Sequence, residues 1–234
     1  MVPRVVLAVL AAVAVLTFAH HAGDDTTSAA SADGAQVAAA PVVPAAPGGV
    51  VAAGQAAPVP VRASGDGFLV LDRARPAVGI GAQVTYTVEV EPALRAEAPA
   101  LQDQVALVLD DTRHGWAAQQ ALQQVTDPAG ARVRVLLALP ATVDRLCAQA
   151  GFTTSGVLSC WNGRFAALNV MRWRQAAAGF ESVSQYRSYQ INHEFGHGLG
   201  HLHEYCPGPG ALAPVMMQQT KGLLGCRPNP WPVP

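Results

Sequence analysis

The sequence has little net charge, a single lysine (Lys221) and no apolar run as long as a typical transmembrane helix. Its 15 Lys and Arg residues are nearly balanced by 16 Asp and Glu residues, which gives a formal net charge of −1. A chain this close to neutral lacks the strongly basic surface that favours binding to nucleic acid or to anionic lipid. We therefore expect no nucleic-acid partner.

The longest apolar run covers residues 5–19, and its 15 residues follow Arg4. This length falls short of the roughly 20 residues of a transmembrane helix and matches the apolar core of a signal peptide. We interpret residues 1–22 as a signal peptide or, alternatively, as a retained N-terminal anchor, and we expect membrane association only in the second case. Either way the rest of the chain is exported, and is secreted or associated with the cell envelope.

Residues 23–66 are dominated by Ala, Pro, Gly and Val and show no periodic apolar pattern. Because the prolines block helix continuation and favour extended chain, we interpret this segment as a flexible, disordered linker. A short strand at residues 59–62 is the alternative. Residues 67–234 then form one domain, long enough to bury a core, which we expect to be monomeric.

Within this domain the residue patterns predict strands at 83–91, 131–139 and 164–174, and helices at 101–109, 142–149 and 182–200. Strands and helices alternate, so the predicted class is mixed α and β. Beyond residue 200, Pro and Gly are dense and regular structure should be scarce. The strand at 164–174 either offers an edge to an extended peptide or lies inside the sheet.

The four cysteines contain no CxxC pair, which argues against a structural zinc site of that type. Export favours disulfides instead. Three pairings are possible, and the simplest joins sequence neighbours, Cys147 to Cys160 and Cys206 to Cys226.

The informative segment is HEFGHGLGHLH, residues 193–203, which contains four of the seven histidines. His193 and His197 are four residues apart, so on a helix they lie one turn apart on the same face and can bind one metal ion. Glu194 follows the first histidine but points elsewhere, so it can hold a metal-activated water without being a ligand.

A catalytic zinc site needs a third protein ligand from another direction. On a continued helix the Cα of His201 would lie about 12 Å beyond that of His193, nearly in line with the other two ligands. A glycine readily ends a helix, so Gly200 allows His203 to approach from the following segment. The expected ligands of one Zn²⁺ per chain are therefore His193, His197 and His203, with His201 outside the metal's shell or on the surface.

His193, Glu194, His197, Gly200 and His203 match HExxHxxGxxH, and through this motif the sequence resembles the metzincin zinc endopeptidases. The resemblance implies an α+β zincin fold: a twisted mixed sheet with the active-site helix, and a small irregular C-terminal subdomain. It also implies a Met-turn in which Met216, or alternatively Met217, lies beneath the imidazoles. The wider C-terminal pattern is closest to an uncharacterised family of exported actinobacterial zincin-like proteins.

The C-terminal pattern also differs from the metzincins in one respect. Many metzincins have Tyr two residues after the turn methionine, whereas this chain has Gln218. The residue that stabilises the oxyanion is therefore unassigned, with Tyr205 and Gln218 as candidates. Glu204, directly after the third histidine, is similar to the residue found there in the astacin branch.

The expected function is hydrolysis of peptide bonds in a peptide or protein substrate by a zinc-activated water, with Glu194 as general base and then general acid. Two alternatives stay open. One is a catalytically silent, zinc-containing extracellular module that binds a partner in the cell envelope, and the other is an amidase acting on a non-peptide amide. Glu194 favours hydrolysis, because a metal needed only for folding requires no base beside it.

Overall fold

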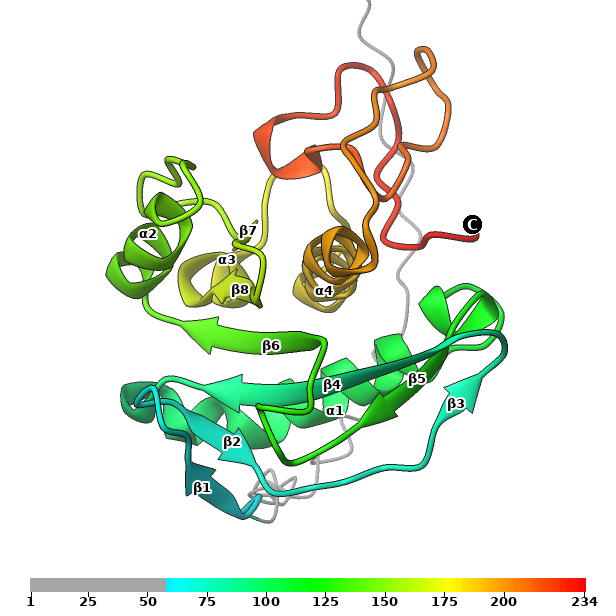
Figure 1. Ribbon diagram of the computed structural model, residues 1–234. Coiled ribbons are helices and arrows are strands. Elements are labelled where there is room, and N and C mark those ends of the chain that lie inside the picture. The colour runs from blue at the N-terminus through cyan, green and yellow to red at the C-terminus, as the bar shows by residue number, and fades with distance from the viewer. Residues whose placement is uncertain (1–57) are drawn as a thin grey trace, which may run out of the picture. The chain divides into compact units, whose positions relative to one another are not determined.

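The computed structural model describes residues 58–234 (Figure 1), so the predicted leader and most of the predicted linker lie outside the described residues. These residues form a twisted mixed sheet of eight strands with helices on both faces. The mixed α and β class expected from the sequence is confirmed.

One half of the sheet is formed by three parallel strands and an antiparallel edge. β4 (Gln83–Val90) pairs in parallel with β6 (Val133–Ala138), and β6 pairs in parallel with β8 (Phe165–Asn169). The two-residue strand β7 (Cys160–Trp161) pairs antiparallel with β8 and forms the outer edge. This edge strand lies beside the helix that carries the histidine motif.

The other half of the sheet consists of short strands that the sequence patterns did not predict. β4 also pairs in parallel with β5 (Ala121–Gln124) and antiparallel with β2 (Leu69–Leu71). β1 (Val61–Ala63) extends the sheet from β2, and β3 (Val78–Gly79) extends it from β5. Strands of two to four residues are too short to show a convincing alternation.

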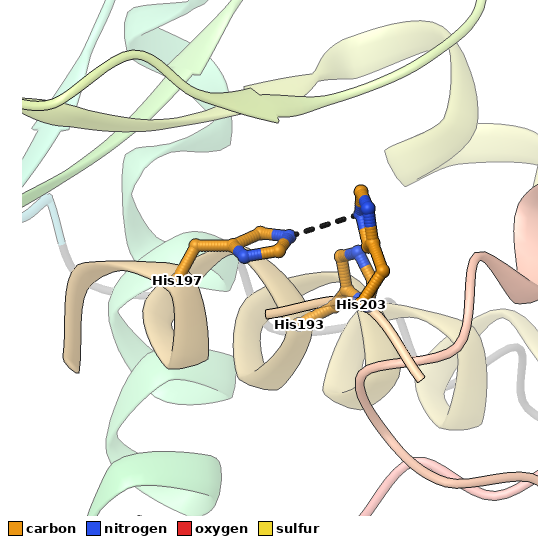
Figure 2. Close-up of side chains that lie close together, drawn as sticks. All are labelled: His193, His197 and His203. Carbon is orange, nitrogen blue, oxygen red and sulfur yellow. Dashed lines mark hydrogen bonds between the residues drawn. The ribbon is translucent and has the colours of Figure 1, made fainter. Parts of the chain in front are cut away.

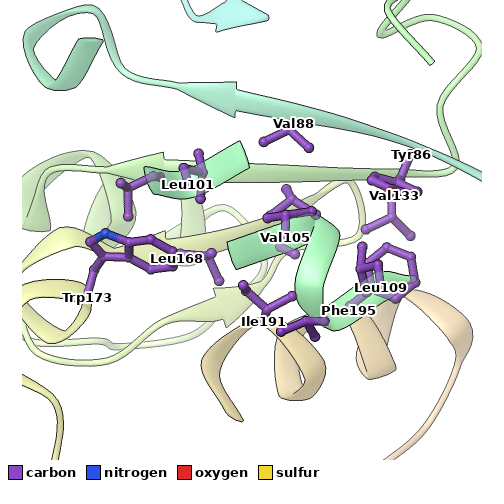
Figure 3. Packing of buried hydrophobic residues seen from close by; sticks show 14 of the residues in the cluster. Tyr86, Val88, Leu101, Val105, Leu109, Val133, Leu168, Trp173, Ile191 and Phe195 are labelled. Carbon is purple, nitrogen blue, oxygen red and sulfur yellow. The ribbon is translucent and has the colours of Figure 1, made fainter. Parts of the chain in front are cut away.

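Helices cover both faces because consecutive side chains of a strand point in opposite directions. In β6, Val133, Val135 and Leu137 join the larger core, whereas Leu136 and Ala138 join a second core. The larger core contains side chains of α1 (Ala98–Leu109), α3 (Val170–Gln175) and α4 (Val183–Leu199) (Figure 3), and the second contains side chains of α2 (Pro140–Ala148). The remaining elements are three 3₁₀ helices within the described residues: η1 (Pro92–Glu97), η2 (Trp116–Ala118) and η3 (Gln219–Lys221).

The folded part begins earlier than predicted. β1 lies inside the segment 23–66 that was predicted as linker, so that prediction is wrong for residues 61–63 and the alternative of a short strand is right in kind. Asp66 is also part of the fold, because Arg134 donates to its carboxylate at 2.6 and 3.0 Å and to the fully buried Glu89. A short strand within a segment rich in Ala, Val and Pro resembles linker because tertiary pairing, not local pattern, holds it.

The predicted strand 164–174 is correct only in its first half. β8 ends at Asn169, whose side chain accepts a hydrogen bond from the backbone N–H of Met171 at 3.0 Å and so caps α3. β8 also has a partner on each side, so it lies inside the sheet and offers no edge to a peptide. The edge on this side of the sheet is β7.

Both disulfides of the simplest pairing are present, Cys147–Cys160 and Cys206–Cys226. They are consistent with an extracellular location. None of the helices within residues 58–234 has the length and apolar character needed to cross a membrane. After α4 the described chain is irregular apart from η3 and two isolated bridges, and Figure 1 shows this segment on the side of α4 opposite the sheet.

Candidate metal centre

Helix α4 begins and ends where the sequence predicts. The Ser182 hydroxyl accepts a hydrogen bond from the Gln185 backbone N–H at 3.0 Å, which caps the N-terminus. At the C-terminus Gly200 has φ 104°, in the left-handed region, and the N–H of His201 donates back to the Gly196 carbonyl at 3.0 Å. The chain therefore leaves the helix axis at Gly200, three residues after His197, and His203 can turn back toward the helix.

The three predicted ligands come together in space. His193 and His197 point from the same face of α4, and His203 approaches them from the segment after the helix (Figure 2). One nitrogen from each ring lies within 4.8 Å of the other two, and the Nε2 atoms of His197 and His203 are 3.2 Å apart. These three histidines can hold a metal ion.

Backbone carbonyls orient the two helix histidines. His193 Nδ1 lies 2.8 Å from the Val215 carbonyl, and His197 Nδ1 lies 2.8 Å from the His201 carbonyl. A carbonyl can only accept, so in each ring Nδ1 carries the hydrogen and Nε2 keeps a free lone pair. This arrangement is typical of metal-binding histidines, whose second nitrogen is held by an outer partner.

Burial keeps these rings in the neutral form that can bind a metal. It lowers the pKa of His193 to about 3, with smaller contributions from the neighbouring histidines. The pKa values of His197 and His203 are also lowered, mainly by burial, and the positive charge of Lys221 adds to the effect on His203. Metal binding therefore does not have to compete with proton binding near neutral pH.

Glu194 lies beside the ligands, buried on α4 and facing the same cleft as His193. Burial is the cause of its raised pKa of about 8. A carboxylate with little access to water and a raised pKa is a better proton acceptor than an ordinary one. The chemistry of the donor set, three neutral imidazoles and an adjacent basic carboxylate, fits a metal ion that activates water.

The segment 215–217, expected as the Met-turn, is attached to the centre through three consecutive carbonyls. The Val215 carbonyl accepts from His193, the Met216 carbonyl accepts from the backbone N–H of Glu204 at 3.1 Å, and the Met217 carbonyl accepts from the Tyr189 hydroxyl at 2.9 Å. The second of these bonds holds the residue directly after His203. Backbone carbonyls of the turn, and not its side chains, thus position two of the three ligands.

Met216 itself is buried against α4 at Gly196, between the two helix ligands. A Cβ added at Gly196 would lie only 2.6 Å from the Met216 sulfur and 2.7 Å from a ring carbon of Trp116. A glycine at this position is therefore needed for close approach. Sequence reasoning identified the histidines but missed Gly196, for which the only signal was its position between them.

Trp116 is a second residue that sequence reasoning missed. Its ring stacks on the His201 ring at 4.5 Å, and its Nε1–H donates to the Asn192 carbonyl at 2.9 Å. Trp116 therefore supports the turn whose carbonyl orients His197. Nothing in its local sequence indicates this role, because the contact joins residues far apart in the chain.

The centre lies in a cleft with a volume of about 540 Å³. One side is formed by β7 and the loop before it, and the other by the segment after α4 and by η3. The lining residues are Phe152, Thr153, Thr154, Leu158, Ser159, Cys160, Trp161, His193, Glu194, His197, Gly200, His201, Leu202, His203, Gln218 and Lys221. Of the two oxyanion candidates, Gln218 faces this cleft and Tyr205, whose side chain is exposed, is absent from its lining.

The loop between α2 and β7 is held firmly although it lacks secondary structure. The Cys147–Cys160 disulfide closes it, the Asp144 carboxylate accepts from the Gly156 N–H at 2.8 Å, and Asn169 Nδ2 donates to the Gly156 carbonyl at 3.0 Å. One wall of the cleft is therefore a cross-linked loop.

Comparison with known proteins adds one match. A family model described as "Protein of unknown function (DUF3152)" matches residues 55–225, the greater part of the chain. No curated protein and no solved structure matches the chain.

Proposed function

Since the chain belongs to the DUF3152 family, whose description leaves function open, we propose from the site itself that the protein is an exported zinc-dependent endopeptidase. The observation that carries the proposal is the convergence of His193, His197 and His203 beside the buried carboxylate of Glu194, within one cleft. A metal site that only stabilised the fold would need neither the carboxylate nor the cleft.

The choice of zinc rests on the ligands and their spacing. Three imidazoles with an open fourth position are typical of catalytic zinc. A tetrahedral zinc with bonds of about 2.0–2.1 Å to nitrogen separates its ligands by about 3.3 Å. The 3.2 Å between His197 Nε2 and His203 Nε2 is close to this value.

When bound, zinc would act as a Lewis acid that polarises the substrate carbonyl and lowers the pKa of a bound water to about 7. Glu194 would accept the proton of the attacking water and return it to the leaving amine, so that one carboxylate acts first as base and then as acid. Gln218 faces the cleft and is our candidate for stabilising the oxyanion through its amide N–H. The edge strand β7 lines the same cleft and offers unpaired backbone groups to an extended peptide.

We further propose a metzincin-like arrangement, in which Met216 packs below the ligands. The buried Met216 side chain against Gly196, and the turn that contacts both His193 and Glu204, support this proposal. The two disulfides and the apolar segment at residues 5–19 support export.

The test compares wild type with Glu194→Gln on a broad peptide pool, at equal zinc content measured by elemental analysis. We expect zinc and fold to be retained and the hydrolysis rate to fall by about 10³–10⁴-fold, the upper part of the range for general acid–base catalysis, because Glu194 serves both steps. Chelation should abolish the activity and zinc should restore it.

Glu204→Gln is the matched control, since the Glu204 side chain is exposed and faces a different cavity. It should leave the rate unchanged. If wild type cleaves no peptide in the pool while binding zinc and an envelope partner, the protease proposal is wrong and the binding module replaces it. Cleavage of non-peptide amides alone would favour the amidase.

A further inference from the structure

A small polar subsite adjoins the metal centre, and most of its side chains have no role in the proposed reaction. It is a pocket of about 40 Å³ next to His193 and Glu194, lined also by Leu158, Ser159, Tyr189, Gln218, Thr220 and Lys221. Since a water molecule needs about 10–15 Å³ of such volume, the subsite has room for about three water-sized groups. It can therefore accept a short polar group of a substrate but not a large side chain.

Ser159 and Gln218 each present a free hydrogen-bond donor to this subsite. The Ser159 oxygen accepts from the Asn169 N–H at 3.1 Å and from Gln190 Nε2 at 2.8 Å, so both its lone pairs are used and its own O–H is left to donate. Gln218 accepts from Lys221 Nζ at 3.2 Å through its side-chain oxygen, which leaves the amide NH₂ group as a donor.

Lys221 adds a positive charge that no described residue neutralises by an ion pair. It is exposed, and among residues 58–234 it takes part in none of the ion pairs. Of the residues that the structure describes, Glu194 is the only acidic one that lines the subsite, and its proposed role is in the reaction. A pocket with an ammonium, an amide NH₂ and a hydroxyl as donors best fits a ligand with a negative charge and two acceptor oxygens.

We propose that this subsite binds a carboxylate of the substrate next to the scissile bond, with Lys221 as the residue that determines specificity. The inference rests on the proposed peptidase function and names its substrate class, a peptide with a short acidic group at the cleavage site. Two sources share this chemistry: the side chain of an internal Asp, and the free α-carboxylate at the end of a peptide. The side chain of Glu is one methylene longer and should fit less well.

The test uses a position-scanning peptide library with blocked termini, in which Asp, Glu or Asn occupies each position in turn. With the zinc-loaded full chain we expect one position next to the cleaved bond at which Asp exceeds Asn by about 10–150-fold in kcat/KM, the effect of one charge-assisted hydrogen bond. Lys221→Met should remove the difference between the Asp and Asn rates, and Lys221→Arg should restore most of the preference.

Binding supplies a readout that does not depend on turnover. On the Glu194→Gln variant, calorimetry should show the Asp peptide binding more tightly than the Asn peptide, and adding Lys221→Met should remove the difference. A second library with free C-termini separates the two sources. Hydrolysis that depends on Lys221, occurs only in this second library and releases the last residue assigns the subsite to the α-carboxylate.

The outcomes separate the two proposals. Hydrolysis that is equal for Asp and Asn at every position and unaffected by Lys221→Met, in both libraries, overturns the subsite and leaves the peptidase standing. Absence of hydrolysis by wild type overturns the peptidase. In that case a lysine-dependent preference for the Asp peptide in the calorimeter still supports a carboxylate-binding subsite.

Discussion

Replacing His203 or His201 by Ala gives the sharpest test of how the centre is built, because the two residues are two positions apart and have different roles. His203 brings its Nε2 to within 3.2 Å of His197 Nε2, whereas His201 contributes only its backbone carbonyl, and its ring stacks on Trp116. Alanine removes the first contribution and keeps the second.

Replacing a residue that hydrogen-bonds to a metal ligand, but does not bind the metal itself, costs about 10–100-fold in metal affinity. Replacing a ligand should therefore cost at least about 100-fold. With zinc in excess over its dissociation constant, a 100-fold loss removes about 2.7 kcal/mol of zinc-dependent stabilisation. For a domain of this size this corresponds to a fall of about 5–11 °C in the zinc-induced rise of Tm. His201→Ala should keep its zinc and lose only the stacking of its exposed ring on Trp116, worth about 0.5 kcal/mol.

The assay is thermal unfolding with and without zinc, together with elemental analysis of the purified variants. Equal zinc loss from both variants would refute the ligand assignment, because it would mean that the His201 ring binds the metal. Full zinc retention by His203→Ala would refute it as well.

Three further predictions concern stability. Gly196→Ala should lower the free energy of unfolding by about 1 kcal/mol. Overpacking against Met216 costs about 1–3 kcal/mol, and Ala regains about 1 kcal/mol of helix propensity. Stabilisation of this variant in a urea titration would contradict the close approach of Met216 to Gly196. Replacing Cys147 and Cys160 together by Ser should cost about 3 kcal/mol by the chain-entropy model and expose the cleft loop to proteolysis, whereas an unchanged urea midpoint would mean that hydrogen bonds alone hold the loop. Hydrogen bonding to Arg134 lowers the pKa of Asp66 below its ordinary 3.8. The contribution of Asp66 to stability is therefore complete above pH 3.8 and is lost as the pH falls toward the lower pKa of the folded state. Asp66→Asn should flatten the acid limb of a curve of stability against pH, and an unaltered limb would disprove the coupling.

Much of the centre was predictable because its chemistry depends on local spacing. Two histidines four residues apart share a helix face in any helix, and the Ser182 cap and Gly200 define where this helix starts and stops. The longer strands and helices, such as those at 83–91, 131–139 and 182–200, were also predictable because their residue patterns are local. The short strands were missed, and the strand at 164–174 was predicted too long, because its apolar residues suit a strand and a buried helix equally well.

By itself, the amino-acid sequence determined the chemistry of this protein: which side chains can bind a metal, which carboxylate lies beside them, and which cysteines can pair. Tertiary structure decided their use. The carbonyls of residues 215–217 orient His193 and hold the chain next to His203, and Ser159, far from Lys221 along the chain, completes the subsite with it. These contacts join segments that are distant along the chain, so no local pattern records them, and they form only because the sheet and α4 bring their ends together.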